Sequence, residues 1–129
     1  MDTEAMYQQY VWAGAMRRDA DAVADLFTED GVLEAPLVPE GHVFPHRLEG
    51  RDEIRCGLAE YYAKSSPSGG TVDGERSRLV LHHPDPDTLI AELDAAFTDA
   101  PPVFLVQVFR FRDGAIAHLR DYFHPDTVS

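Results

Sequence analysis

The sequence predicts an α+β domain in which one curved sheet wraps around helices and leaves a cavity between them. Helical periodicity dominates the first half of the chain, and alternating strand-like segments dominate the second half. The strongest single signal is Asp113-Gly114, which lies between two alternating apolar runs and predicts a β-hairpin over residues 103–125. With 129 residues the chain can build one hydrophobic core and not two. We therefore expect a single domain over residues 1–129.

Three helices are expected before residue 66. Over residues 3–18 apolar residues recur every three or four positions, which is typical of an amphipathic helix. A short second helix follows, capped by Asp19 or Asp21, and residues 28–31 end it. The third helix begins near residue 51 and ends at Ser65. The apolar faces of the second and third helices are predicted to consist of Val23, Leu26, Phe27, Ile54, Leu58, Tyr61 and Tyr62.

The strands are expected over residues 32–36, 46–49, 77–82 and 88–97 and in the closing hairpin. Residues 37–46 form a loop that is unusually apolar, with Val38 and Phe44 among its residues. Such a loop is either a lid over a pocket or a surface that packs against a partner subunit. Residues 65–76 are rich in Ser and Gly and are predicted to be a flexible linker.

Asp121 is the only ionisable residue on an otherwise apolar face of the last strand. Alternation places this face inward, with Ala117, Leu119, Asp121 and Phe123, and turns His118, Arg120 and Tyr122 outward. A buried carboxylate must find a partner or accept a raised pKa, because burial disfavours its charged form. Near neutral pH such an acid is a candidate general base. The structural alternative is a bulge that turns Asp121 outward, or neutralisation by Arg120 or Arg112.

Three further polar residues are candidates for the same site. In the strand before the turn, the exposed Arg110 and Arg112 imply an inward row of Leu105, Gln107, Phe109 and Phe111. Gln107 is then a polar amide in an apolar row. Glu92 and Asp94 share one face of the strand at residues 88–97, although alternation gives the inward face to Leu89, Ala91 and Leu93. If that strand faces the other way, both acids join Asp121 as an acid/base pair.

Composition argues against several classes of partner. The net charge of −12 and pI of about 4.7 disfavour nucleic acid and anionic membrane surfaces. No apolar run has membrane-spanning length and the N-terminus lacks a signal-peptide pattern, so we expect a cytoplasmic protein. Cys56 is interpreted as a small helix residue, Glu34 as a solvated strand acid, and His46 as a minor candidate for the cavity. The six histidines lack metal-ligand spacing, so we expect no metal, and no stretch resembles a phosphate-binding glycine loop, so we expect no cofactor.

Three strings resemble the SnoaL-like branch of the nuclear transport factor 2-like superfamily. They are QYVWAGAMRRDADAVADLFTEDGVLEAP at residues 9–36, LEGRDEI at 48–54 and VFRFRDGAIAHLRDYFHP at 108–125. The resemblance implies the cone-shaped α+β barrel shared by ketosteroid isomerase, limonene epoxide hydrolase and polyketide cyclases. It also implies a homodimer formed through the outer sheet face that carries Tyr122, His118, Val106 and Val108.

The resemblance also implies roles for individual residues. Tyr10 matches the ketosteroid isomerase tyrosine, and Gln107 falls where the acid donor lies. Ala35 stands where the steroid-isomerase base is needed, so that activity is not expected. Asp121, in the string RDYF, resembles the base of limonene epoxide hydrolase and SnoaL-type cyclases. Asp94 matches a second hydrolase aspartate, whereas a glutamate stands at the position of its arginine.

We therefore expect a cofactor-independent enzyme of secondary metabolism, such as antibiotic biosynthesis, that cyclises or isomerises an apolar polyketide-type intermediate. Asp121 is the expected base, and Tyr10 and Gln107 are the expected donors. One alternative is epoxide opening, by water or by an internal hydroxyl that forms a cyclic ether, with Glu92 and Asp94 facing the cavity. Another is a non-catalytic, dimeric ligand-binding module. The expected substrate-binding residues are Leu105, Phe109, Leu119, Phe123, Phe44 and Tyr62.

Overall fold

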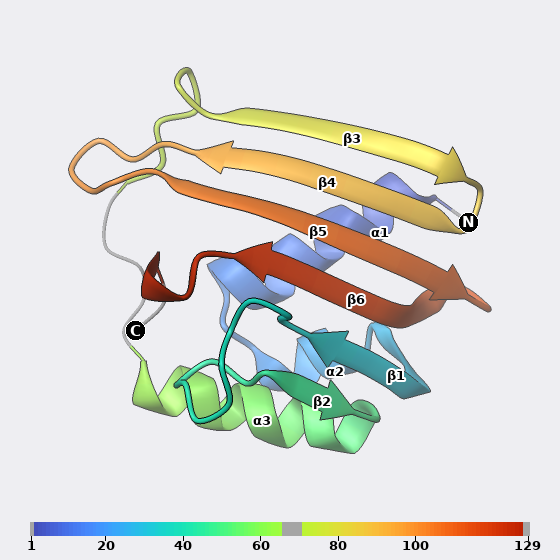
Figure 1. Cartoon of the computed structure of the whole chain (residues 1–129). Coiled ribbons are helices and arrows are strands. Elements are labelled where there is room, and N and C mark those ends of the chain that lie inside the picture. Colours follow the sequence, from blue (N-terminus) through green and yellow to red (C-terminus); the bar gives the residue numbers. More distant parts are fainter. Residues whose placement is uncertain (1, 66–70, 128–129) are drawn as a thin grey trace.

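The computed structural model describes residues 2–65 and 71–127 (Figure 1). Its helices are α1 (Thr3–Val11), the π-helical turn η1 (Trp12–Met16), α2 (Ala20–Ala24), α3 (Arg51–Lys64) and the short 3₁₀ turn η2 (Pro125–Thr127). Its strands are β1 (Phe27–Glu34), β2 (Arg47–Glu49), β3 (Arg78–Asp85), β4 (Thr88–Ala95), β5 (Val103–Arg112) and β6 (Ala115–Phe123). The predicted α+β class is confirmed.

The six strands form one curved, mixed sheet in the order β2-β1-β6-β5-β4-β3. β1 pairs in parallel with β6, and the other neighbouring strands pair antiparallel. In Figure 1, α1 lies behind the long strands, while α3 runs beside β1 and β2. The face of the sheet toward α1 is called the inner face below, and the opposite face the outer face. The inner face therefore meets the apolar sides of the helices.

The apolar side chains gather into two groups on the inner face. The main core joins the helices to the centre of the sheet, and its largest fully buried side chains include Phe27, Leu33, Ile54, Leu89, Phe109, Ile116 and Leu119. The smaller group consists of Ala35, Val38 and Phe123, with Phe44 and Leu105 packed against it. Burial of this apolar area is the main stabilising contribution to the fold.

The closing hairpin forms as predicted. Asp113 and Gly114 have φ angles of 52° and 78°, so both turn residues adopt the left-handed conformation that a tight I′-type hairpin turn requires. Beyond the turn the register shifts, because Arg110 pairs with His118 whereas Phe111 pairs with Ile116. The extra residue is Ala117, so Ile116 joins the core in place of the predicted Ala117, while the alternation from Leu119 onward is as predicted. Asp121 consequently points inward, and the predicted alternative of an outward-turned carboxylate is wrong.

The N-terminal boundaries differ from the sequence prediction. The helix expected over residues 3–18 is α-helical only to Val11 and continues as the π turn η1. Its N-cap is Asp2, whose side chain accepts a hydrogen bond from the Ala5 amide. Of the two predicted caps for the second helix, Asp19 and Asp21, the structure confirms Asp19 as the N-cap of α2.

The end of the second helix was predicted wrongly. Phe27, assigned by its spacing to the apolar stripe of that helix, is the first residue of β1 and pairs with Ile116. Periodicity cannot separate a short helix from a buried strand in so few apolar residues, and the parallel pairing with β6 decides the conformation. Residues 28–31 consequently belong to the strand. Residues 66–70 of the predicted linker lie outside the described residues, and Val72 bridges Phe97.

The loop between β1 and β2 is tied at its ends. The Ala35 amide donates to the His46 carbonyl over 2.9 Å, and the His46 ring contacts the Val38 carbonyl oxygen at 2.5 Å. Val38 is fully buried and packs in the smaller apolar group. A compact loop with close ends and internal packing is an Ω-loop, and it holds Phe44 against the sheet.

Replacing Gly114 by alanine is expected to destabilise the protein by about 1 kcal/mol, because a Cβ atom strains the left-handed conformation at this position. Urea unfolding of both proteins measures the difference. The matched control is Gly74→Ala, since Gly74 lacks a left-handed φ and a Cβ atom there meets no neighbour within 4 Å. The control should change stability by less than about 0.5 kcal/mol. Equal losses in both variants would contradict the turn assignment.

Candidate active site

Asp121 and Gln107 form a buried polar pair at the centre of the inner face. They lie directly opposite each other on β6 and β5, and each is 7% exposed. Gln107 Nε2 donates to Asp121 Oδ2 over 3.4 Å, which is a long hydrogen bond. The pair lies in register between the two apolar groups, because Phe109 and Leu119 belong to the main core while Leu105 and Phe123 belong to the smaller one.

Burial sets the charge state of Asp121. Desolvation raises the pKa of its carboxyl group to about 7, and the hydrogen bond from Gln107 opposes this rise only in part. Asp121 Oδ1 is buried and lacks a hydrogen-bond partner among the described residues. A carboxyl group in this state exchanges protons near neutral pH, which is the property that a general base or acid requires.

Two tyrosines of α1 face this carboxyl group. Tyr7 is buried, Tyr10 is partly buried, and their rings pack edge-on against Phe109 with centroid distances of 5.7 and 5.3 Å. Burial raises the pKa of both phenols, and the charge of Asp121 is the second cause in each case. Both phenols therefore stay protonated at neutral pH as hydrogen-bond donors within electrostatic reach of Asp121.

A second aromatic cluster stands beyond the pair, and it joins three elements. Phe44 of the Ω-loop packs edge-on against Tyr61 of α3 at 4.9 Å and against Phe123 of β6 at 5.1 Å. Burial raises the pKa of the Tyr61 phenol, and the charge of Asp121 contributes to the rise. The predicted binding residues Phe44 and Phe123 thus lie together. The sequence suggested that this loop is either a lid over a pocket or a surface for a partner subunit. The contacts of Phe44 place that residue over the inner face of the sheet.

Tyr62 lies in different surroundings. The Arg18 guanidinium stands over its ring at 4.9 Å and donates to the carbonyl oxygens of Tyr62 and Ser65 and to the Ser65 hydroxyl. These contacts close the end of α3. The pKa of Tyr62 is raised by burial to about 12, and Asp121 is not among the causes. The structure therefore assigns Tyr62 a packing contact and does not bring it to the Asp121–Gln107 pair.

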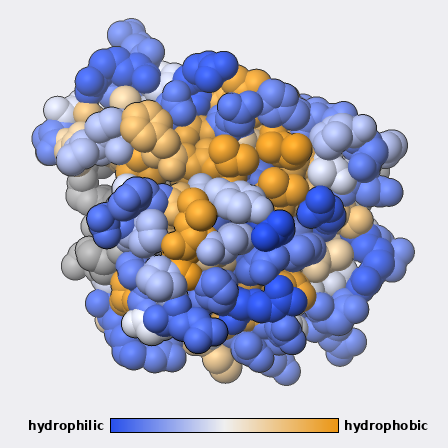
Figure 2. Space-filling view, in the orientation of Figure 1, coloured by the Kyte–Doolittle hydropathy of each residue, from blue (hydrophilic) through white to orange (hydrophobic). Residues whose placement is uncertain are grey.

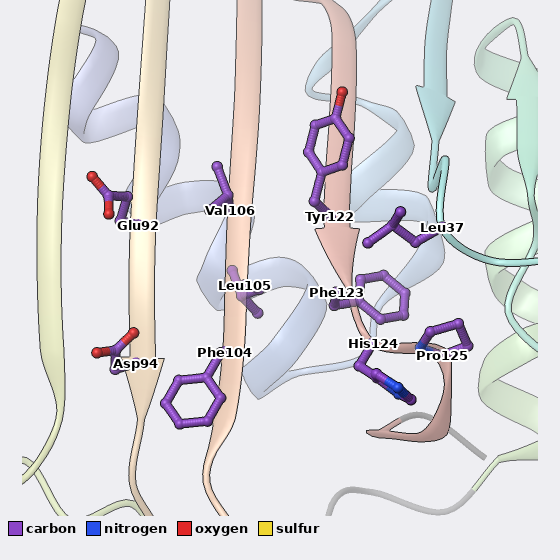
Figure 3. A pocket seen from close by; sticks show the side chains of 10 residues that line it. All are labelled: Leu37, Glu92, Asp94, Phe104, Leu105, Val106, Tyr122, Phe123, His124 and Pro125. Carbon is purple, nitrogen blue, oxygen red and sulfur yellow. The ribbon is translucent and has the colours of Figure 1, made fainter.

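Glu92 and Asp94 lie on the outer face. In the β4–β5 register they stand opposite Val106 and Phe104, whereas Ala91 stands opposite Gln107. They line a pocket of about 490 Å³ at the end of the sheet (Figure 3). The sheet itself separates both acids from Asp121, because alternate residues of a strand point to opposite faces. The structure consequently corrects their grouping with Asp121 as catalytic residues.

Two other predicted residues have structural contacts. Glu34 lies on the outer face, where its carboxylate contacts Arg47 at 2.8 Å, His118 at 2.7 Å and Arg120 at 3.0 Å. Desolvation opposes ionisation of Glu34, yet these partners outweigh it and lower its pKa. The prediction that Glu34 is a solvated acid is therefore wrong, because its carboxylate is largely buried within a cluster of ion pairs. His46 fastens the Ω-loop, as described above.

Sequence reasoning missed two members of the site, Tyr7 and Tyr61. Tyr7 precedes Tyr10 by one helical turn, so the two side chains share a face of α1. This three-residue spacing could have indicated from the sequence that Tyr7 lies beside Tyr10. Tyr61 lies within electrostatic reach of Asp121 because α3 packs beside β1, a contact that local sequence does not encode. Within residues 2–65 and 71–127, no three His, Cys, Asp or Glu side chains form a group that could hold a metal ion. None of the helices described is long and apolar enough to cross a membrane.

The buried carboxyl group makes stability depend on pH. A pKa of about 7 in the folded chain, against an ordinary 3.8, means that the unfolded chain releases this proton first as the pH rises. The contribution of Asp121 to the free energy of unfolding should therefore fall by about 3 to 4 kcal/mol between pH 4 and pH 8, and then level off. The Asp121→Asn variant should not lose this stability as the pH rises, because its amide does not titrate. Urea unfolding from pH 4 to pH 8 should show its stability advantage growing over that range, and a constant difference would refute the raised pKa.

Comparison with known proteins agrees with this architecture. The model of the SnoaL-like domain matches residues 4–119. The uncharacterized protein YesE of Bacillus subtilis is 29% identical to the chain over 118 residues, which are 88% of the chain and 76% of YesE.

Solved structures share the fold. A proposed isomerase from Bacillus subtilis has a TM-score of 0.66 and 23% identity, with 98% of this chain and 92% of that chain covered. A proposed polyketide cyclase from Sinorhizobium meliloti has a TM-score of 0.58 and 22% identity, with 91% and 93% covered. The fold is the nuclear transport factor 2-like cone. Because the domain model spans most of the residues, the chain belongs to the SnoaL-like domain family.

Proposed function

We propose that the chain is a cofactor-independent enzyme that cyclises or isomerises an apolar, polyketide-type small molecule. The observation that carries this proposal is Asp121, a buried carboxyl group with a pKa of about 7 and one oxygen that finds no hydrogen-bond partner in residues 2–65 and 71–127. As a carboxylate, Asp121 removes a proton from a carbon next to a carbonyl group, and the electron pair moves to the carbonyl oxygen. The resulting enolate then closes a ring or takes the proton back at another carbon.

The neighbouring donors suit the charge that develops. The Tyr10 phenol stays protonated because its pKa lies well above the ordinary value, with burial as the main cause. Gln107 uses one N–H on Asp121 and keeps a second for a substrate oxygen. In a site shielded from water, each well-placed donor is worth about 10²- to 10³-fold in rate. Tyr7 and Tyr61 are additional phenols on the same side of the sheet.

Family membership supports the reaction class. Two proteins with this fold are a proposed isomerase and a proposed polyketide cyclase, which are the two reaction types proposed here. Epoxide opening by two acids receives less support, because Glu92 and Asp94 lie on the outer face. A purely ligand-binding role needs no proton acceptor at neutral pH, whereas the pKa of about 7 suits Asp121 to that task.

The test of the base is exchange of a carbon-bound proton. In deuterated water, the protein should catalyse deuterium uptake beside the carbonyl group of small cyclic ketones, followed by NMR. Asp121→Asn should lower the rate by about 100- to 10,000-fold, because it removes the base. The wild-type rate should rise with pH around pH 7 and then level, since only ionised Asp121 accepts a proton.

Two matched variants complete this experiment. Asp99→Asn changes an exposed acid on a loop and should retain the wild-type rate. Asp94→Asn tests the outer-face acid, and it too should retain the rate if Asp121 works without a second acid. Full exchange by Asp121→Asn, or a comparable loss in Asp94→Asn, would reject the assignment.

We also propose that the chain forms a homodimer through the outer face of the sheet. Figure 2 shows an apolar area over β4 and β5 that is bordered by polar side chains. Phe104 and Val106 are exposed there, at 59% and 37%. Acids of β4 lie on one side of this area, and Arg120 of β6 lies on the other. A two-fold axis over β5 would bring the acidic strand of one copy against the basic strand of its partner.

Replacing Val106 by lysine should therefore dissociate the dimer, because a long charged side chain would be placed in the apolar centre of the interface, where burial removes its hydration. Sedimentation velocity should show twice the chain mass, 14.4 kDa, for the wild type and a single chain for the variant. The control is Met16→Lys, an exposed position on η1, away from this face. A monomeric wild type at micromolar concentration would exclude the proposed interface.

A further inference from the structure

When it is ionised, Asp121 carries a negative charge that has no counter-ion among the described residues. Its Oδ1 atom has no partner among residues 2–65 and 71–127, and its Oδ2 atom receives only the long bond from Gln107. No cationic side chain is among the causes of its pKa shift. Arg120, the next residue on β6, points to the outer face and contacts Glu34. Arg18 is occupied at the end of α3.

Aromatic residues flank the Asp121–Gln107 pair on both sides along β5 and β6. Tyr7, Tyr10 and Phe109 pack together on one side, and Phe44, Tyr61 and Phe123 pack together on the other. The face of an aromatic ring attracts a cation, and this attraction strengthens where water is excluded. A carboxylate within aromatic walls is the combination that a protonated amine with an apolar body satisfies best. The net charge of −12 also attracts cations toward the protein.

We propose that the Asp121 site binds small protonated amines that carry an apolar body, and binds them more tightly than neutral molecules of the same shape. An ammonium N–H donates to Asp121 Oδ1 and supplies the missing counter-ion. It occupies the place of the proton that a substrate gives up, so such amines compete with substrate. An anionic ligand of the same size meets the carboxylate without any compensating cation and is rejected. This inference shares with the proposed function only the requirement that ligands reach Asp121.

The preference for amines should depend on pH. The polar groups that face Asp121 are Gln107 on β5, Tyr7 and Tyr10 on α1, and Tyr61 on α3. The amide does not titrate, and the three phenols remain protonated through neutral pH. Asp121 is therefore the one group among them that changes charge between pH 6 and pH 8. Over this range the amine stays protonated, so its binding should tighten as Asp121 ionises.

The experiment compares benzylamine, benzyl alcohol and benzoate, which share one ring and differ in charge. At pH 8, calorimetric titration should show benzylamine binding at least about tenfold more tightly than benzyl alcohol, and benzoate not binding. At pH 6 the preference should shrink. Asp121→Asn should bind the amine and the alcohol equally, and retained alcohol binding shows that its site is intact. Asp99→Asn, an exposed acid, should keep the wild-type preference.

Equal binding of amine and alcohol by the wild type would overturn the inference. So would a preference that survives in Asp121→Asn, or the failure of all three compounds to bind. The proposed reaction is judged separately by deuterium exchange. Amine selectivity without exchange would reject the proposed reaction and keep the ligand class. Exchange that depends on Asp121, without amine selectivity or inhibition, would reject the ligand class and keep the reaction.

Discussion

The burial of one carboxyl group opposite an amide is the constraint on which the site depends. Asp121 loses hydration and gains only a long hydrogen bond from Gln107, so its pKa rises to about 7. The surrounding fold must offset this cost with apolar burial on both sides of the pair. Strained or poorly satisfied polar groups persist where function retains them. Because the hydrogen bond from Gln107 only partly replaces the lost hydration, Asp121 accepts a proton near neutral pH and, when ionised, is an uncompensated charge.

The sheet supplies the rigidity that such a site needs. Asp121 and Gln107 lie on adjacent long strands joined by a tight turn, so their opposition is fixed by backbone pairing. The aromatic residues come from other elements, namely α1, α3 and the Ω-loop that carries Phe44. The conformation of the loop is held by the Ala35 and His46 contacts. The proposed catalytic pair therefore lies on strands, whereas most of the aromatic residues beside it come from helices and a loop.

The sequence predicted the hairpin and its inward row because both follow from local rules. The positive φ of Asp113 and Gly114 and the two-residue period of β5 and β6 are properties of neighbouring residues. Gln107 and Asp121 could therefore be placed on the inner face without a structure. Phe27 shows the limit of this reasoning, since its conformation depends on pairing with β6, far away in the sequence. Grouping Glu92 and Asp94 with Asp121 failed because it set aside the alternation of β4 in favour of a resemblance.

By itself the sequence determined the fold class, the closing hairpin, and one acid and one amide directed into an apolar row. Period and turn chemistry encode these features over a few residues. Only the tertiary structure decided that Asp121 has no cation beside it within the part of the chain that is described, and that Arg120 pairs with Glu34 instead. It also decided that Tyr7 and Tyr61 face the carboxyl group from two different helices. Distances between elements follow from how helices pack on a curved sheet, and no local pattern specifies that packing.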